Sequence, residues 1–216
     1  MSTEDLLRVI RRNLRLSSMH QVLRELRKRN VRLKDLHALE IFGGSGGFHT
    51  KDYATHVSTL DIWEIEPKYE GILRQNFPLA EVMLTNSYKE IENTHKKYSL
   101  IIVDNPMSTL GDYCEHFDLF PAIFRVAMDS TVLILNVIPE ISDASLKKFP
   151  YLFNPSQLER RRSFYQTNHP EKVSFEEMVE VYRNLTTTNN FNLEWYFFQK
   201  RSVVYYFVLK IKRSEG

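Results

Sequence analysis

Residues 39–48 read Leu-Glu-Ile-Phe-Gly-Gly-Ser-Gly-Gly-Phe, and this stretch holds four of the seven glycines in the chain. Its first half is apolar apart from one glutamate, as expected for a short buried strand. The glycines that follow let the backbone turn tightly and approach a bound nucleotide closely. The stretch therefore predicts a cofactor loop after a first strand. An ordinary strand-to-helix connection is the alternative, because a glycine pattern alone is weak evidence.

Outward from this loop, short apolar runs alternate with helical segments, which is typical of a parallel sheet with crossover helices. The runs predict strands near residues 37–42, 57–65, 80–85, 98–104 and 130–138. Two aromatic and β-branched runs, 192–199 and 203–212, predict an antiparallel hairpin at one edge. The expected fold class is α/β: a Rossmann-like, mostly parallel sheet with helices on both faces and a C-terminal antiparallel hairpin.

The chain divides by pattern into an extension and a main domain. Residues 1–35 have apolar side chains at helical spacing and predict an N-terminal helical extension. Residues 36–216 form the expected main domain. Within it, residues 140–190 break the alternation of strands and helices and predict a helical insertion.

Helix-start signals support these assignments. Serine accepts hydrogen bonds from the first free amides of a helix, and proline fits its first turn. Helix starts are predicted at Ser2, at Ser17 or Ser18, at Pro67, at Ser87 and at Ser174, where Glu177 completes a capping box. The second of these helices has an apolar stripe of Met19, Val22, Leu23 and Leu26.

Composition limits the class of protein. The chain has one cysteine, Cys114, which excludes an internal disulfide and a cysteine-rich zinc site, and its seven histidines lack paired ligand spacing, so no metal site is predicted. No run approaches the roughly 20 apolar residues that span a bilayer. We expect a cytoplasmic protein with no membrane contact.

Charge is unevenly distributed. Residues 1–34 hold ten Lys/Arg against three Asp/Glu, residues 35–144 hold seven against seventeen, and residues 145–216 hold twelve against seven. Basic ends of this kind favour an anionic partner such as nucleic acid. Solvated helix faces explain the pattern about as well. The N-terminal helices are also a possible site for a protein partner.

A carboxylate is expected at the end of the second strand. A nucleotide held by a glycine loop needs a partner for its ribose hydroxyls about 20 residues further on. Glu64 follows Gly47 by seventeen residues and is the preferred candidate, with Glu66 as its competitor. A solvated pair of acids at a strand end is the plain alternative.

Residues 39–106 resemble the cofactor half of the class I S-adenosylmethionine-dependent methyltransferases. Residues 40–48 look like the first motif of that family, and residues 62–67 like the second. The resemblance implies S-adenosylmethionine as the cofactor. The residues that it assigns to the cofactor are Glu40, Phe42, Gly43, Gly44, Ser45, Gly46, Glu64, Ile65, Asn86 and Ser87.

The fourth expected strand ends in Asp104-Asn105-Pro106-Met107. This partly resembles the Asp/Asn-Pro-Pro-aromatic motif of amino-methylating members, which holds the target amino group. Asp104, Asn105 and Pro106 are therefore the candidate catalytic residues, although the second proline and the aromatic residue are missing. Cytosine-5 enzymes carry a Pro-Cys nucleophile at this point, and Cys114 lies too far along the chain to replace it.

The function expected from these features is methylation of a nucleic acid, either an RNA or a DNA base. Methylation of a protein or small molecule is an alternative, since the same cofactor half would serve it. The incomplete motif after Asp104 also leaves open a catalytically inactive, methyltransferase-like binding subunit.

Overall fold

The structure is a computed structural model that describes residues 17–47, 49–104, 115–140, 142–148, 154–201 and 203–215. The helix predicted to start at Ser2 lies outside this range, as do Phe48, Asn105 and Pro106. The chain splits after Ser87 into two compact units. Each unit is described by itself.

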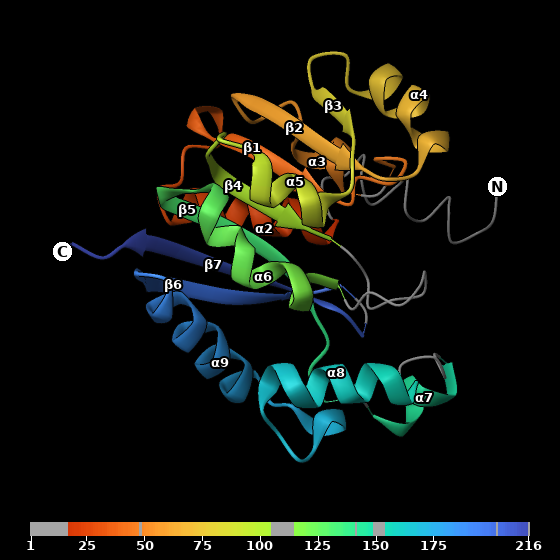
Figure 1. The fold of residues 1–216 in the computed structure, drawn as a ribbon, viewed down its shortest axis with the longest axis vertical. Coiled ribbons are helices and arrows are strands. Elements are labelled where there is room, and N and C mark those ends of the chain that lie inside the picture. The colour runs from red at the N-terminus through yellow and green to blue at the C-terminus, as the bar shows by residue number, and fades with distance from the viewer. Residues whose placement is uncertain are drawn as a thin grey trace. The chain divides into compact units, whose positions relative to one another are not determined.

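The first unit contains three parallel strands, β1 (His37–Ile41), β2 (Thr59–Glu64) and β3 (Glu81–Leu84). β2 pairs with both neighbours, so the order is β3-β2-β1 (Figure 1). All three strands end within one to two residues of their predicted limits. Because they run in the same direction, their carboxyl ends share one edge, which is where the sequence places the cofactor residues.

Among the described residues, four helical segments accompany these strands: α2 (Ser18–Lys28), the 3-10 turn η1 (Leu33–Asp35), α3 (Thr50–Tyr53) and α4 (Pro67–Asn76). Ser17 caps α2 by accepting from the His20 amide at 3.1 Å. Its hydroxyl also donates to Asp52 at 2.6 Å, which fastens α2 to α3. The predicted apolar stripe of α2 is fully buried, so that prediction is confirmed.

The second unit contains β4 (Tyr98–Val103), β5 (Ala127–Val137), β6 (Phe191–Lys200) and β7 (Tyr205–Arg213) in the order β4-β5-β7-β6. β4 and β5 are parallel, whereas β7 is antiparallel to both β5 and β6. Every residue of β4 is buried, as predicted for a central strand. The seven-stranded, mostly parallel α/β sheet with its C-terminal antiparallel hairpin confirms the expected fold class.

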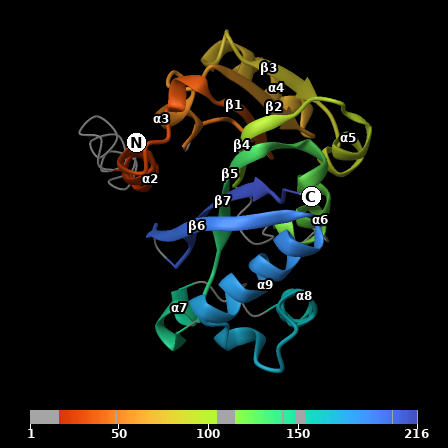
Figure 2. The same ribbon diagram turned by 90° about the vertical axis from the view of Figure 1, so that its left-hand side faces the viewer.

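The described helices of the second unit begin with α5 (Ser87–Asn93), whose first residue is the last residue of the first unit. The others are α6 (Glu115–Val126), α7 (Asp143–Lys148), α8 (Pro155–Tyr165), the 3-10 turn η3 (Pro170–Lys172) and α9 (Phe175–Thr188). α9 begins with the predicted capping box of Ser174 and Glu177. It lies along the hairpin (Figure 2), and the ring centres of Tyr182 and Phe207 are 5.0 Å apart. No helix in the described part of the chain is long and apolar enough to cross a membrane.

The arginines of α8 do not form the solvent-facing basic cluster that their sequence suggests. Arg161 is completely buried and donates to the carbonyl oxygens of Pro170 at 2.7 Å and Ile138 at 2.8 Å. Arg160 pairs with Asp118, and Arg162 pairs with Glu159. Arg161 therefore holds the insertion to the end of β5, and the charges of its neighbours are balanced.

Candidate functional site

The glycine loop follows β1 and turns sharply. Phe42, Gly44 and Gly46 have φ values of 66°, 54° and 63°, all in the left-handed region that favours glycine. A Cβ on Gly46 would lie 2.2 Å from the ring of Phe77, so only glycine fits there. A Cβ on Gly43 would lie 2.3 Å from Ile62. The loop thus packs directly on β2 and on the residue that ends α4.

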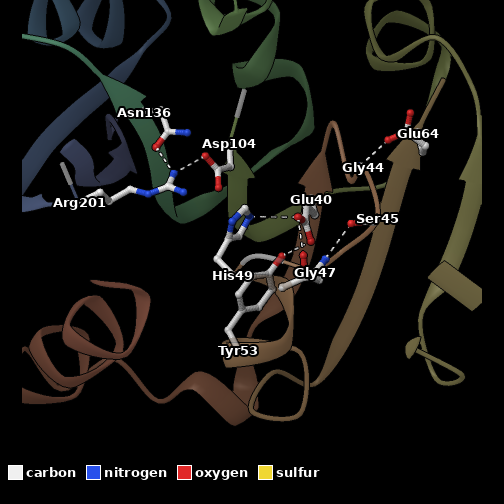
Figure 3. Close-up of polar contacts among 11 residues, drawn as sticks. Glu40, Gly44, Ser45, Gly47, His49, Tyr53, Glu64, Asp104, Asn136 and Arg201 are labelled. Carbon is white, nitrogen blue, oxygen red and sulfur yellow. Dashed lines mark hydrogen bonds and ion pairs between the residues drawn. The ribbon is translucent and has the colours of Figure 1, made fainter. Parts of the chain in front are cut away.

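Glu64, the last residue of β2, binds this loop through its carboxylate. Oε2 accepts a hydrogen bond from the Gly44 amide (Figure 3), and Oε1 accepts from the amides of Ile65 at 2.8 Å and Glu66 at 2.7 Å. Glu64 is 5% exposed. A carboxylate has about four acceptor positions, so one position on Oε2 remains for a further donor.

The neighbours of Glu64 point elsewhere. Ile65 is 55% exposed. Glu66, the competitor of Glu64, is the exposed N-cap residue of α4, and its carboxylate lies 3.3 Å from Lys68. The two acids therefore differ in environment: Glu64 is buried against the loop, and Glu66 forms a surface ion pair.

Glu40 is the most enclosed of the predicted cofactor residues. Its carboxylate is 1% exposed and accepts hydrogen bonds from Thr50 at 2.8 Å and from the Tyr53 hydroxyl. The Nε2 atom of His49 lies 3.1 Å from Oε1. These three partners come from the segment that follows the glycine loop, so Glu40 fixes that segment to β1 (Figure 3). Its contact with a cofactor remains a prediction.

The remaining predicted cofactor residues lie in the same unit. Ser45 accepts a hydrogen bond from the Gly47 amide at 3.3 Å, which keeps the loop compact. After β3, the Thr85 amide donates to the Glu64 carbonyl at 2.7 Å. Asn86 is half-buried, and Ser87 is buried as the first residue of α5. All ten residues that the sequence assigns to a cofactor thus lie in the last residues of β1 and β2, in the loops after β1, β2 and β3, or at the start of α5.

Asp104 follows β4 in the second unit, where it forms an ion pair that the sequence does not predict. Arg201, in the turn of the β6–β7 hairpin, places Nη1 2.7 Å from Asp104 Oδ1. The same nitrogen donates to Oδ1 of Asn136, near the end of β5, at 3.1 Å (Figure 3). Asn105 and Pro106, the other candidate catalytic residues, lie outside the described residues.

A third feature of possible function is a basic hollow in the first unit, with a volume of about 670 Å³. It opens beside the end of α2, where Asn30 adopts a left-handed conformation and turns the chain toward η1. Its polar lining consists of Arg27, Asn30, Arg32, Lys34 and His56. Among the described residues, Asp35 pairs with Arg32, whereas Arg27 and Lys34 form no ion pair.

Among the residues that the structure describes, no group of three or more histidine, cysteine, aspartate or glutamate side chains could hold a metal ion. Sequence reasoning missed Asn136, Arg201 and the partners of Glu40. Asn136 alone carried a visible signal, as a polar residue inside the apolar run 132–137.

Comparison with known proteins supports the fold. No protein-family model and no curated protein sequence matches the chain. Among solved structures, magnesium protoporphyrin IX methyltransferase from Synechocystis PCC 6803, with bound SAH, is similar at TM-score 0.55 and 14% identity, covering 91% of this chain and 82% of that one.

Two further solved structures are similar over comparable lengths. A putative RNA methyltransferase from Pyrococcus horikoshii gives TM-score 0.57 and 7% identity, covering 92% of this chain and 84% of that one. TYW2 from M. jannaschii, in complex with AdoMet, gives TM-score 0.54 and 14% identity, covering 88% and 75%. Sequence identities this low are evidence for a shared fold only. The chain therefore has the fold of the class I S-adenosylmethionine-dependent methyltransferases.

Proposed function

We propose that this chain is an S-adenosylmethionine-dependent methyltransferase that acts on a base of RNA or DNA. The observation that carries the proposal is the hydrogen bond between the glycine loop and Glu64, which places a buried carboxylate directly beside the loop. The fold supplies the context, since it is shared by a porphyrin methyltransferase with bound SAH, a putative RNA methyltransferase and TYW2 in complex with AdoMet. A nucleotide-like methyl donor needs both features at one strand edge.

The residues of the first unit fit such a donor. Glu64 keeps one acceptor position, which suits a ribose hydroxyl. Apart from the chain neighbours of Gly44, no atom of the described residues lies within 4 Å of the position that a Cβ on Gly44 would occupy, so the loop has an open side. Gly44 and Ser45 would border the bound donor there, and Asn86 would bind its base.

S-adenosylmethionine supplies a methyl group on a sulfonium, which is transferred by in-line displacement. The protein accelerates such a reaction chiefly by aligning the acceptor and excluding water. Asp104 is the residue proposed to orient the acceptor and to receive its proton, with Arg201 keeping the carboxylate in place.

The basic hollow supports a nucleic acid as the substrate. Arg27, Arg32 and Lys34 bring three positive charges to one concave surface, and of these Arg32 is paired with Asp35. Cations that neutralise phosphates release counterions from the nucleic acid, so such a surface favours RNA or DNA over neutral substrates.

Two measurements test the function. Calorimetry should detect binding of S-adenosylmethionine and its demethylated product, and failure to bind either would overturn the cofactor assignment. A radiolabelled donor should then label total RNA or DNA from cells. Label in protein or small molecules alone would disprove the nucleic acid substrate. A donor that binds but is never consumed would indicate a binding subunit.

The hollow is tested separately by the double variant Arg27→Gln/Lys34→Gln. On single-stranded nucleic acid, loss of two phosphate contacts should reduce the slope of log K against log salt by about 1.4. Lys89→Gln/Lys172→Gln removes the same charge from exposed positions outside the hollow and serves as the control. Equal slopes for both double variants would exclude the hollow as a phosphate site.

A further inference from the structure

Three polar side chains from distant parts of the chain meet at the carboxyl ends of β4 and β5. Arg201 Nη1 lies 2.7 Å from Asp104 Oδ1 and 3.1 Å from Asn136 Oδ1, so one nitrogen binds two oxygens (Figure 3). The side chain of Asp104 is 5% exposed, and that of Arg201 is 26% exposed. Asn136 is 1% exposed. The group thus lies just beneath the surface, and Arg201 forms its outer side.

The orientation of the Asn136 amide is fixed by its partner. A guanidinium group can only donate hydrogen bonds, so the atom that faces Arg201 must be the carbonyl oxygen of the amide. The Nδ2 atom of the amide therefore faces away from Arg201. It is buried and has no hydrogen-bond partner among the residues that the structure describes. A buried donor without an acceptor costs about 1–3 kcal/mol, which is unusual inside a central strand.

Arg201 is held in the position from which it binds both Asp104 and Asn136. Its backbone amide donates to the Val204 carbonyl across the hairpin turn at 2.9 Å, and its guanidinium lies 4.6 Å from the ring centre of Tyr206. Burial lowers the pKa of Arg201, but the Asp104 carboxylate and Tyr206 raise it, and the net shift is upward. The guanidinium therefore stays charged and keeps both oxygens engaged.

We propose that Asn136 is a specificity-determining residue whose Nδ2 donates a hydrogen bond to the acceptor substrate, and that Arg201 positions Asn136 and Asp104 for it. The N–H groups of Asn136 can donate a hydrogen bond to a ring nitrogen, and the carboxylate of Asp104 can accept one from an adjacent amino group. Together they are complementary to an amino group beside a ring nitrogen. Adenine (N6 and N1) and cytosine (N4 and N3) carry this pattern on their Watson–Crick edge, whereas guanine and uracil present a ring N–H there. The inference rests on the proposed function and narrows it to exocyclic amino groups.

Every bond and proton of the proposed methyl transfer is accounted for with Asp104 and Asn136 as the protein groups around the substrate base. The amino nitrogen attacks the methyl carbon of the sulfonium, so the N–C bond forms as the S–C bond breaks and the electron pair stays on sulfur. One amino proton passes to Asp104 and then to water. Asn136 holds the ring nitrogen during this step, which fixes the orientation of the base and of its amino group beside Asp104.

The test uses the full chain, a radiolabelled donor and four single-base RNA oligonucleotides. Wild-type protein should label the adenine or cytosine oligonucleotide and leave uracil unlabelled. Asn136→Asp keeps an oxygen for Arg201 but replaces the donor with an acceptor, so it should lower kcat/KM for the preferred oligonucleotide about tenfold to a hundredfold. Arg201→Lys should restore part of the activity that Arg201→Met loses.

Unfolding in urea gives a readout that does not depend on methylation. Asn136→Leu removes the buried amide, so the variant should be as stable as the wild type or more stable, yet inactive. Thr131→Val is the matched control, at the opposite end of β5. Thr131 donates to the carbonyl oxygens of Tyr98 and Met128, so this variant should lose stability and keep its base selectivity.

The outcomes separate the inference from the proposed function. Labelling of nucleic acid that is unaffected by Asn136→Asp, or that goes to uracil, overturns the role of Asn136 while leaving the methyltransferase in place. A large loss of stability in Asn136→Leu would show that the amide is a structural group and would also overturn it. Donor binding without labelling of any nucleic acid would overturn the substrate class itself.

Discussion

The backbone amide of Gly44 donates a hydrogen bond to the carboxylate of Glu64, which lies 20 residues further along the chain. This contact joins the loop after β1 to the end of β2. It fixes the position of the loop backbone at Gly44, where a Cβ would meet open space. It also means that Glu64 has two tasks, since the carboxylate that orders the loop is the one proposed to bind the donor. Structural and binding effects of Glu64 must therefore be measured separately.

Glu64→Ala should weaken binding of S-adenosylmethionine by about tenfold to a hundredfold, because it removes a charged acceptor worth about 1.5–3 kcal/mol. Isothermal titration calorimetry measures the change, and circular dichroism checks that the variant is folded. Glu66→Ala is the matched control. Glu66 is exposed and pairs with Lys68, so its loss should change the Kd by less than about twofold. The reverse ranking would assign the ribose to Glu66.

Gly46→Ala should destabilise the protein far more than Gly44→Ala. Both residues have positive φ, so each alanine carries a backbone cost of about 1–2 kcal/mol. At Gly46 the new methyl group would also lie 2.2 Å from Phe77, whereas at Gly44 it would meet open space. Urea denaturation should show the difference in the free energy of unfolding. Equal losses would mean that Phe77 moves aside freely.

Glu40→Gln should lower the free energy of unfolding by about 1–3 kcal/mol, because one end of the new amide would present N–H groups to donors. Thr50 and His49 lie at one carboxylate oxygen and Tyr53 at the other, so neither orientation of the amide satisfies all three partners. Glu70→Gln, in an exposed pair with Arg74, is the control and should cost less than about 0.5 kcal/mol. Similar losses in both variants would show that the Glu40 network contributes little.

Local patterns were sufficient to predict most of the fold. Apolar runs located the strands to within a few residues, and the capping box of Ser174 and Glu177 marked the start of α9. These features depend on neighbours in the sequence: side-chain alternation, glycine conformation and the first turn of a helix. The position of Glu64 beside the glycine loop follows from parallel strand order for the same reason.

Contacts between distant residues could not be predicted in this way. Asp104 and Arg201 are separated by 97 positions, and nothing near either residue identifies the other. The arginines of α8 show the same limit: three adjacent arginines in the sequence do not reveal that Arg161 is buried, because a helix points neighbouring side chains in different directions. The middle one is buried and bonded to two carbonyl oxygens. Tertiary packing, rather than local charge, decides its role.

Lys210→Met should stabilise the protein near neutral pH. Lys210 lies half-buried on β7 opposite Trp195, and desolvation lowers its pKa from the ordinary value of 10.5, while Glu194 acts weakly in the other direction. Since the charged form is disfavoured only in the folded state, the penalty is full below the folded pKa. It is relieved as the pH rises toward 10.5, where the unfolded chain also loses its proton.

The stability gained by Lys210→Met should therefore be larger at about pH 7 than at about pH 10. Urea denaturation at both pH values measures it. Lys212→Met, an exposed position two residues further along β7, is the control and should change stability little at either pH. A gain that stays constant with pH would show that the methionine acts through added apolar contact with Trp195, because only relief of a buried charge depends on protonation.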